Sequence, residues 1–259
     1  HQLRKLGSKY PYSCLVTKDV SKEVQDTLTR LKINIIKVNF HEILQSIGFE
    51  KDKVEYIYNK IHFVCLFIFT SNIKKGVYID ADILILKNLD HLFDTDTTNR
   101  IHLANDLTLR HSPNNGWMLV KLKNKYNAGV ICFESNHRLF YDMMNYLKKV
   151  TEKEVKVIEK WTDQEVFNHF INNNLINVSV LDFKYNTWFN TIDFFVNKSK
   201  LINEDDIHII HYILSPKPWT TLSVQRYGSK IEKKYWLMWF DAYKEVISNN
   251  FRDDHTYIN

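Results

Sequence analysis

Two aspartates, Asp80 and Asp82, interrupt an otherwise apolar stretch and limit most narrowly how this chain can fold. Residues 77–79 precede them as a short apolar segment, and residues 83–86 follow as another. Carboxylates at the mouth of a buried strand are costly unless a positive charge pairs with them. Two oxygen ligands one residue apart suit a divalent cation such as Mg²⁺ or Mn²⁺. Because open α/β sheets bind ligands beyond the carboxyl ends of their strands, the pattern predicts a metal that holds a phosphate.

The composition favours a globular protein with one α/β core, and the positive net charge favours a small anionic ligand. The chain has 259 residues, 44% of them hydrophobic, and its net charge of +5 is spread over many lysines. A nucleic-acid reader would carry a concentrated basic stripe, so we expect no nucleic-acid partner. The longest apolar run, residues 63–69, is too short to span a membrane. Three separated cysteines, Cys14, Cys65 and Cys132, predict free thiols in a reducing, cytoplasmic compartment.

Hydrophobic periodicity predicts alternating strands and helices along the chain. Residues 12–16 and 33–38 are expected strands, joined by a helix over 22–31 as in a parallel α/β unit. Residues 54–70 have the spacing of a buried helix, whereas residues 108–125 have no clear period and are expected to be a long loop. Further strands are expected over 101–104, 127–133, 178–181 and 207–213, and further helices over 138–150, 165–172 and 228–251. With no repeat or linker, we expect a single domain over 1–259, with a Rossmann-like, mostly parallel sheet flanked by helices.

A histidine and a lysine late in the chain carry the chemistry that a metal–phosphate site needs. His211 lies on the expected strand 207–213, and Lys217 follows six residues later between two prolines. Histidine can bind a metal through a ring nitrogen, and lysine binds phosphate as a point charge. The prolines restrict the loop around Lys217. Together with Asp80 and Asp82, these residues would build one site from both ends of the sheet.

Five motifs follow one another along the chain in a fixed order. They are the D-x-D strand with the segment 89–93, the corner Asn127 to Gly129, the pair Asp163 and Gln164, the pair Tyr185 and Asn186, and His211 with Lys217, Pro218 and Trp219. In this order and spacing the chain resembles the glycogenin-like family of retaining glycosyltransferases over nearly its whole length. The resemblance implies the GT-A fold, a UDP-sugar donor and Mn²⁺ (or Mg²⁺). The family's first strand precedes the part that matches residues 1–16, so we expect that strand to be missing from this sequence.

The resemblance also implies roles for individual residues. The implied metal ligands are Asp80, Asp82 and His211; the implied donor-binding residues are Lys60, Asp80, Ala81, Asp82, Asn105, Asp106, Asn127, Gly129 and Lys217; and the implied catalytic residues are Asp163 and Gln164. The residues alone permit simpler readings. Asp163 can be a helix cap, Lys60 can be a solvated surface lysine, and Gly129 can permit close approach of a ligand or a backbone.

The implied activity is transfer of a hexose (glucose, galactose or N-acetylglucosamine) from a UDP-sugar to a glycan or protein acceptor, with retention. A phosphatase of the haloacid-dehalogenase type also places D-x-D after a strand. It needs Thr or Val where this chain has Leu84, however, and its D-x-D lies on the first strand. An inactive UDP-binding scaffold is the non-enzymatic alternative. The aromatic face of the 228–251 helix suits either the core or a homodimer interface.

Overall fold

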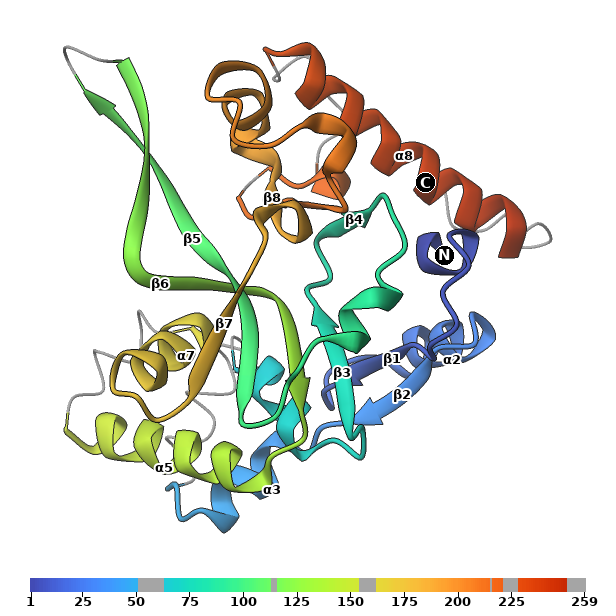
Figure 1. Cartoon of the computed structure of the whole chain (residues 1–259). Helices are drawn as coiled ribbons and strands as arrows, with labels where there is room; N and C mark the ends of the chain where they lie inside the picture. Colours follow the sequence, from blue (N-terminus) through green and yellow to red (C-terminus); the bar gives the residue numbers. More distant parts are fainter. Residues whose placement is uncertain (51–62, 113–115, 154–161, 215, 221–227, 251–259) are drawn as a thin grey trace.

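The computed structural model of the chain describes residues 1–50, 63–112, 116–153, 162–214, 216–220 and 228–250 (Figure 1). The strands are β1 (Ser13–Val16), β2 (Asn34–Lys37), β3 (Lys75–Ile79), β4 (Ile83–Ile85), β5 (Arg100–Ser112), β6 (Gly116–Glu134), β7 (Asn177–Leu181), β8 (Thr187–Trp188) and β9 (Ile209–His211). The α-helices are α1 (Gln2–Lys5), α2 (Lys22–Arg30), α3 (Phe40–Ser46), α5 (His137–Lys153), α7 (Asp163–Asn172) and α8 (Lys230–Asn250). Short 3-10 and π-helical turns are η1 (Val64–Thr70), η2 (Asp90–Asp94), η3 (Phe183–Tyr185), η4 (Phe189–Thr191), η5 (Phe194–Lys198), η6 (Glu204–Asp206) and η7 (Pro218–Thr220).

Three sheets form the framework of the described residues, and two of them contain both parallel and antiparallel pairs. Their strand orders are β1-β2, β3-β6-β5-β7 and β4-β9-β8. The pairs β1–β2, β5–β7 and β8–β9 are parallel, whereas β3–β6, β5–β6 and β4–β9 are antiparallel. The expected α/β class is therefore confirmed, but the expectation of a mostly parallel sheet is wrong. The long central strands β5 and β6 follow one another across a short connection, and such neighbours pair antiparallel.

The β5–β6 hairpin also replaces the long loop expected over 108–125. Its outer ladder runs from the pair Leu107 and Lys121 to the pair Ser112 and Gly116, and it extends away from the rest of the molecule (Figure 1). The register shifts between Leu103 and Ala104 and again between Asn105 and Leu107. Each bulge breaks the alternation of inward and outward side chains. The outer ladder itself is regular, and both shifts lie between it and the base of the hairpin, so no single period-two pattern runs through the whole of β5 or β6.

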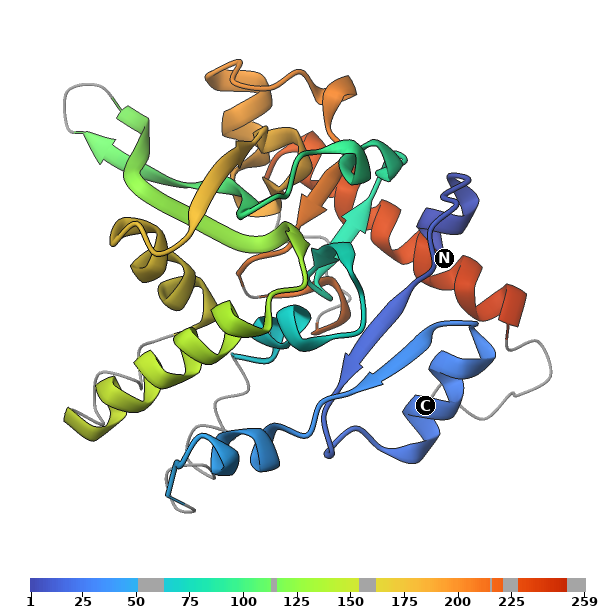
Figure 2. The same ribbon diagram turned by 60° about the horizontal axis from the view of Figure 1, so that its bottom comes forward.

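The N-terminal unit is the strand–helix–strand arrangement that the sequence predicts. The strands β1 and β2 pair in parallel, and α2 lies beside them (Figure 2). The side chain of Ser21 caps α2 by accepting from the N–H of Val24 over 3.3 Å. A cavity of about 1040 Å³ separates this unit from β3, and residues of β1, β3 and α8 line it.

Two aromatic cores fix the elements that carry the candidate site. One lies between the β3-β6-β5-β7 sheet and the segments α3, η1, α5 and α7, and it contains Phe67, Phe140 and Phe167. The other lies between α8 and the β4-β9-β8 sheet, where Trp236 is completely buried. Trp236 and the partly buried Phe240 of the C-terminal helix thus pack into the core, whereas Tyr243 is 49% exposed.

Further predictions are confirmed or revised by the described residues. The strands expected over 12–16, 33–38, 178–181 and 207–213 and the helices expected over 22–31, 138–150 and 228–251 are present with small changes of boundary. The buried segment 64–70 is a 3-10 helix rather than the α-helix expected over 54–70, and residues 54–62 lie outside the described part. The three cysteines are free thiols, with Cys65 and Cys132 buried and Cys14 partly buried. Across the described part of the chain, each helix is too short or too polar to cross a membrane.

Candidate metal centre and its polar surroundings

Asp80 and Asp82 lie where the chain passes from one sheet to the next. Asp80 directly follows β3, and its N–H donates to the carbonyl oxygen of Gly129 on β6 over 2.9 Å. Asp82 directly precedes β4, and its carbonyl oxygen accepts from the N–H of Tyr212 over 2.9 Å. The antiparallel register of β4 and β9 pairs Ile83 with His211. Residues that are about 130 positions apart in sequence therefore meet at this crossing.

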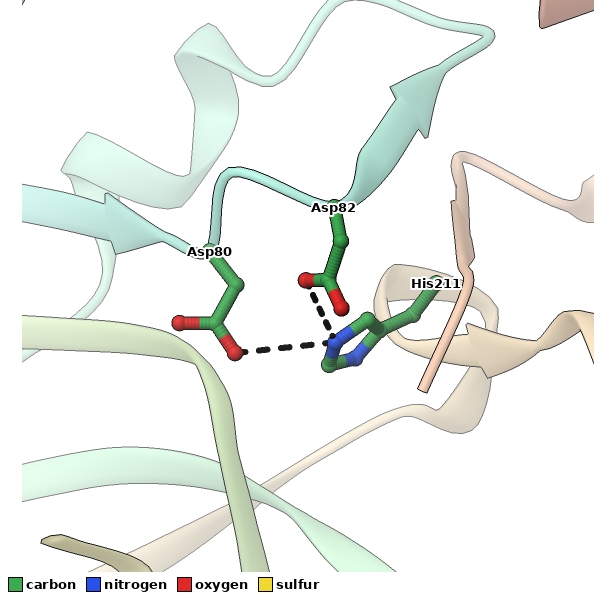
Figure 3. A group of neighbouring side chains, drawn as sticks. All are labelled: Asp80, Asp82 and His211. Atoms are coloured by element: carbon green, nitrogen blue, oxygen red, sulfur yellow. Dashed lines mark hydrogen bonds and ion pairs between the residues drawn. The ribbon is translucent and has the colours of Figure 1, made fainter. Parts of the chain in front are cut away.

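The side chains of Asp80, Asp82 and His211 point toward one another (Figure 3). His211 Nε2 lies 3.1 Å from Asp82 Oδ1 and 3.5 Å from Asp80 Oδ2, and one ligand atom from each residue lies within 4.8 Å of the others. Neighbouring ligands of an octahedral ion with bonds of 2.0–2.1 Å are about 3 Å apart. The three side chains thus have the spacing and the chemistry of one face of a divalent cation site. This is the ligand set that the resemblance implies.

A lysine lies beside the same carboxylates. Lys217 Nζ lies 2.5 Å from Asp82 Oδ2 and also donates to the carbonyl oxygen of Tyr212. Burial alone would raise the pKa of Asp82, but hydrogen bonds and positive charge from His211 and Lys217 outweigh it and lower that pKa to about 2. Asp82 is therefore held as a carboxylate over the physiological range.

Burial and attractive interactions balance differently in setting the pKa of Asp80. Burial raises its pKa above the usual value, and the charge of His211 and a hydrogen bond from Tyr78 only partly offset this. The Tyr78 hydroxyl donates to Asp80 Oδ1 over 2.8 Å, which leaves Oδ2 facing His211. Tyr78 thereby fixes which oxygen of Asp80 faces the cluster.

Gly129 makes room for the imidazole of His211. A Cβ atom at position 129 would lie 2.2 Å from His211 Cε1 and 2.6 Å from His211 Nδ1, distances that no side chain can occupy. The sequence correctly indicates a close approach at Gly129. In the structure the ring of His211 approaches this position, and the predicted contact of Gly129 with the donor stays a prediction.

A second group of polar side chains adjoins His211. Asn127 Nδ2 donates to Gln164 Oε1 over 3.0 Å, and Gln164 Nε2 donates to Asp106 Oδ2 over 3.2 Å. Asn186, whose side chain is completely buried, donates to Asn127 Oδ1 over 2.7 Å. The structure thus brings together three predicted site residues, Asp106, Asn127 and Gln164. Burial raises the pKa of Asp106, because the attraction of Lys125 does not fully compensate for lost solvation.

Asp163 begins helix α7 beside this group. Thr162 is the cap of α7, and the Glu165 side chain accepts from the Thr162 N–H over 2.9 Å. Asp163 is therefore the first helical residue and not the cap, and its carboxylate accepts from the Gln164 N–H over 2.7 Å. Burial raises the pKa of Asp163 to about 7; repulsion from Asp80 adds to the rise, and a hydrogen bond with Cys65 opposes it.

Three predicted site residues remain, namely Ala81, Asn105 and Lys60. Ala81 lies in the turn between Asp80 and Asp82, and Asn105 lies on β5 opposite Tyr126. Lys60 lies outside the described residues, so its predicted contact with the donor stays a prediction.

Sequence reasoning assigns no role to Tyr78 or Asn186. Tyr78 could have been found, because it is two residues before Asp80 and so lies on the same face of β3. Asn186 is part of a recognised motif, but its place next to His211 depends on the pairing of β8 with β9.

Solved structures with the same arrangement of elements are glycosyltransferases of the GT-A fold. The glycosyltransferase GlyE of Streptococcus pneumoniae is 20% identical with a TM-score of 0.51, over 93% of this chain and 64% of GlyE. An active-site mutant of LgtC is 14% identical with a TM-score of 0.53, over 93% of this chain and 88% of LgtC. These likenesses establish the fold.

The family assignment comes from the sequence. The model of glycosyl transferase family 8 matches residues 1–223, and the chain belongs to this family. An uncharacterized protein of Acanthamoeba polyphaga mimivirus is 25% identical over 269 residues, which cover 98% of this chain and 90% of that protein. Glycogenin-1 of Caenorhabditis elegans is 26% identical over 85% of this chain, but the match spans only 46% of glycogenin-1. The predicted resemblance to the glycogenin-like family is confirmed.

Proposed function

We propose that the chain is a retaining glycosyltransferase that moves a hexose from a UDP-sugar to a glycan or protein acceptor. The observation that carries the proposal is the meeting of Asp80, Asp82 and His211 with Lys217 at one crossing between sheets. A metal-ligand set and a phosphate-binding lysine in contact are what a nucleoside-diphosphate leaving group requires. Membership of glycosyl transferase family 8 supports the same reaction.

The donor atoms favour Mn²⁺ as the ion. Carboxylate oxygens suit Mg²⁺, Ca²⁺ and Mn²⁺, whereas imidazole nitrogen suits first-row transition ions. Two carboxylates and one imidazole therefore fit Mn²⁺ best, with Mg²⁺ as a weaker substitute. When bound, the ion would act as a Lewis acid that neutralises charge on the departing diphosphate, an effect worth several kcal/mol.

Lys217 adds a fixed positive charge to the same place. Its ammonium group is already oriented by Asp82 and by the carbonyl oxygen of Tyr212, and Pro218 follows it directly. A charge that is positioned before the reaction stabilises the developing negative charge without further reorganisation. We therefore assign Lys217 to the diphosphate.

The uncharged sugar fits the second group of side chains. Asn127, Gln164 and Asp106 offer amide and carboxyl groups of the kind that hydrogen-bond sugar hydroxyls. In its ionised form, Asp163 would stabilise positive charge at the anomeric carbon while the acceptor attacks from the face that the diphosphate leaves. Gln164, held by both Asn127 and Asp106, would keep the sugar in place during that exchange.

The test is release of UDP from a panel of UDP-sugars, with Mn²⁺ and then with a chelator. Slow hydrolysis of one donor that stops on chelation is the expected result, and it would also identify the sugar. Calorimetric binding of UDP with Mn²⁺ but no turnover with any donor and acceptor would support the scaffold instead. Hydrolysis of simple phosphate esters without a sugar donor would support the phosphatase. Absence of both UDP binding and UDP release would contradict the proposal.

A further inference from the structure

A single file of hydrogen bonds crosses the site from Asp106 to His211. Gln164 Nε2 donates to Asp106 Oδ2 over 3.2 Å, and Asn127 Nδ2 donates to Gln164 Oε1 over 3.0 Å. Asn186 Nδ2 donates to Asn127 Oδ1 over 2.7 Å, and Asn186 Oδ1 lies 2.7 Å from His211 Nδ1. The file joins β5, α7, β6 and β9 through three side-chain amides.

Two backbone N–H groups fix the direction of this file. The Gly129 N–H donates to Asn127 Oδ1 over 3.0 Å, and the Ala128 N–H donates to Gln164 Oε1 over 3.3 Å. A backbone N–H can only donate, and an amide oxygen can only accept. The oxygen atoms of Asn127 and Gln164 must therefore be the atoms that face these backbone groups. Neither amide can be reversed without placing two donors against each other.

This direction determines which nitrogen of His211 carries a proton. Because Asn127 presents its oxygen to Asn186, Asn186 must present its NH₂ group in return. The remaining atom of that amide, Oδ1, then faces His211 and can only accept. His211 Nδ1 must therefore be the donor in the 2.7 Å contact.

A proton on Nδ1 leaves Nε2 for the metal cluster. His211 Nε2 is the ring nitrogen that faces Asp82 Oδ1 and Asp80 Oδ2 (Figure 3). A neutral imidazole with its proton on Nδ1 presents the Nε2 lone pair to a cation at that position. With the opposite tautomer, the proton would face the cation and Asn186 Oδ1 would have no donor. Asn186 is 0% exposed, so water cannot replace the lost partner.

We propose that Asn186 is a positioning residue that keeps a proton on His211 Nδ1 and so aims Nε2 at the metal. The parallel pairing of Trp188 with His211 places the residue just before β8 alongside the imidazole, with Gly129 leaving space for the ring. The inference rests on the proposed function for the role of the cation. Its structural basis, the two backbone donors, is independent of any metal.

Nuclear magnetic resonance of ¹⁵N-histidine in the whole chain tests the proton directly, with the His211 signals assigned by their loss in His211→Gln. We expect Nδ1 to be protonated both before and after addition of diamagnetic Mg²⁺, and Mg²⁺ to shift the Nε2 signal more than the Nδ1 signal. An unprotonated Nδ1 in either state would overturn the proposal. This measurement needs no variant of Asn186.

The affinity for Mn²⁺, measured in the absence of a sugar donor, tests whether this orientation of His211 matters for metal binding. Asn186→Leu removes the acceptor at nearly constant volume and should weaken Mn²⁺ binding by about 10- to 100-fold in calorimetry, the usual range for a partner of a ligating histidine. The matched control is Asn168→Leu, since Asn168 is also buried and hydrogen-bonded, but to main-chain atoms of Tyr126 and Gln164. That control should bind Mn²⁺ within about twofold of the parent. Equal affinities for the two variants would contradict a role for Asn186.

Asn186→Asp separates the acceptor from the rest of the amide. It keeps an oxygen opposite His211 Nδ1 and loses the donor to Asn127, so the Nδ1 proton should persist even though the fold is less stable. Loss of the Nδ1 proton in this variant would count against the proposal. This test can also be made if Asn186→Leu does not fold. If the parent bound no Mn²⁺, the proposed function would fail, while the Nδ1 proton of the metal-free protein would still decide the role of Asn186.

Discussion

The two halves of the candidate site contain carboxylates, Asp82 and Asp163, whose pKa values are shifted in opposite directions. The cation end consists of Asp80, Asp82, His211 and Lys217, and the amide end consists of Asp106, Asn127, Asp163 and Gln164. At the cation end, hydrogen bonds and electrostatic attraction from His211 and Lys217 lower the pKa of Asp82 to about 2. At the amide end burial dominates, and the pKa of Asp163 rises to about 7. Asp80, although it belongs to the cation end, also has a raised pKa, because its burial outweighs the favourable interactions with His211 and Tyr78.

This difference matches the two parts of the proposed substrate. A diphosphate is charged, and the cation end keeps formal charges in place even without a ligand. A sugar is neutral, and in the proposed function the amide end would recognise it with hydrogen bonds while its carboxylates readily accept protons. The two ends would thus suit a charged and an uncharged group side by side, because their carboxylates have different surroundings.

Removing a charge from the cation end should have the largest effect. Asp82→Asn deletes one metal ligand and the partner of Lys217. A metal contribution of several kcal/mol corresponds to roughly a 1000-fold loss of Mn²⁺-dependent UDP release, at 1.36 kcal/mol for each factor of ten. Steady-state assays over a range of Mn²⁺ concentrations measure the change.

The control for this variant is Asp94→Asn, at an exposed position in η2. It should keep the parent rate, and circular dichroism should show the same secondary structure for both variants. Turnover of Asp82→Asn at the parent rate with Mn²⁺ would mean that the metal is bound elsewhere.

At the amide end, neutralising Asp163 should change stability with a defined pH dependence. Its folded-state pKa of about 7 exceeds the ordinary value of 3.8, so the folded chain holds a proton that the unfolded chain releases. The free energy of unfolding of the parent should therefore fall as pH rises from about 4 to about 7, by up to about 4 kcal/mol from this group. Asp163→Asn lacks that fall. Its free energy of unfolding should therefore rise relative to that of the parent as the pH increases toward 8.

Urea unfolding between pH 5 and 8 measures this difference, with a chelator present so that no cation alters the charge around Asp80. Asp94→Asn again serves as the control and should follow the parent curve. Parallel curves for Asp163→Asn and the parent would show that Asp163 titrates normally and that the two ends do not differ as described.

The fold could be predicted from sequence wherever one local pattern dominates. The unit β1–α2–β2, the strand before Asp80 and the helix α8 are each formed by the segment whose local hydrophobic pattern predicts them. The β5–β6 hairpin could not, because its pairing is a property of two segments together, and the register shifts between the outer ladder and the base of the hairpin. The direction of the sheets likewise depends on which strands become neighbours.

The same distinction applies to the site. Asp80 and Asp82 are evident from one short stretch, whereas His211 and Lys217 are distant in sequence and are joined to them by their chemistry and by the resemblance to a family. Asn186 contacts His211 through the register of two very short strands, which no local pattern encodes. Ligands that touch a substrate can be recognised by chemistry and order. Residues that orient those ligands can be recognised only when the register of the strands is known.

The smallest of these effects should come from Tyr78, which orients a carboxylate without changing any charge. Tyr78→Phe keeps the ring and removes the hydrogen bond of 2.8 Å to Asp80 Oδ1. Asp80 is still held by its main chain directly after β3, so Mn²⁺ affinity should fall only about 3- to 10-fold, at or below the low end of the range for outer-shell partners. Tyr146→Phe is the matched control, because its hydroxyl lies 3.0 Å from His169 Nδ1 between α5 and α7, outside the metal cluster. Calorimetry should show unchanged Mn²⁺ affinity for that control. If Tyr78→Phe also bound Mn²⁺ as the parent does, Asp80 would be oriented by its backbone alone, and the cation end would depend on its charges and not on their hydrogen-bonded supports.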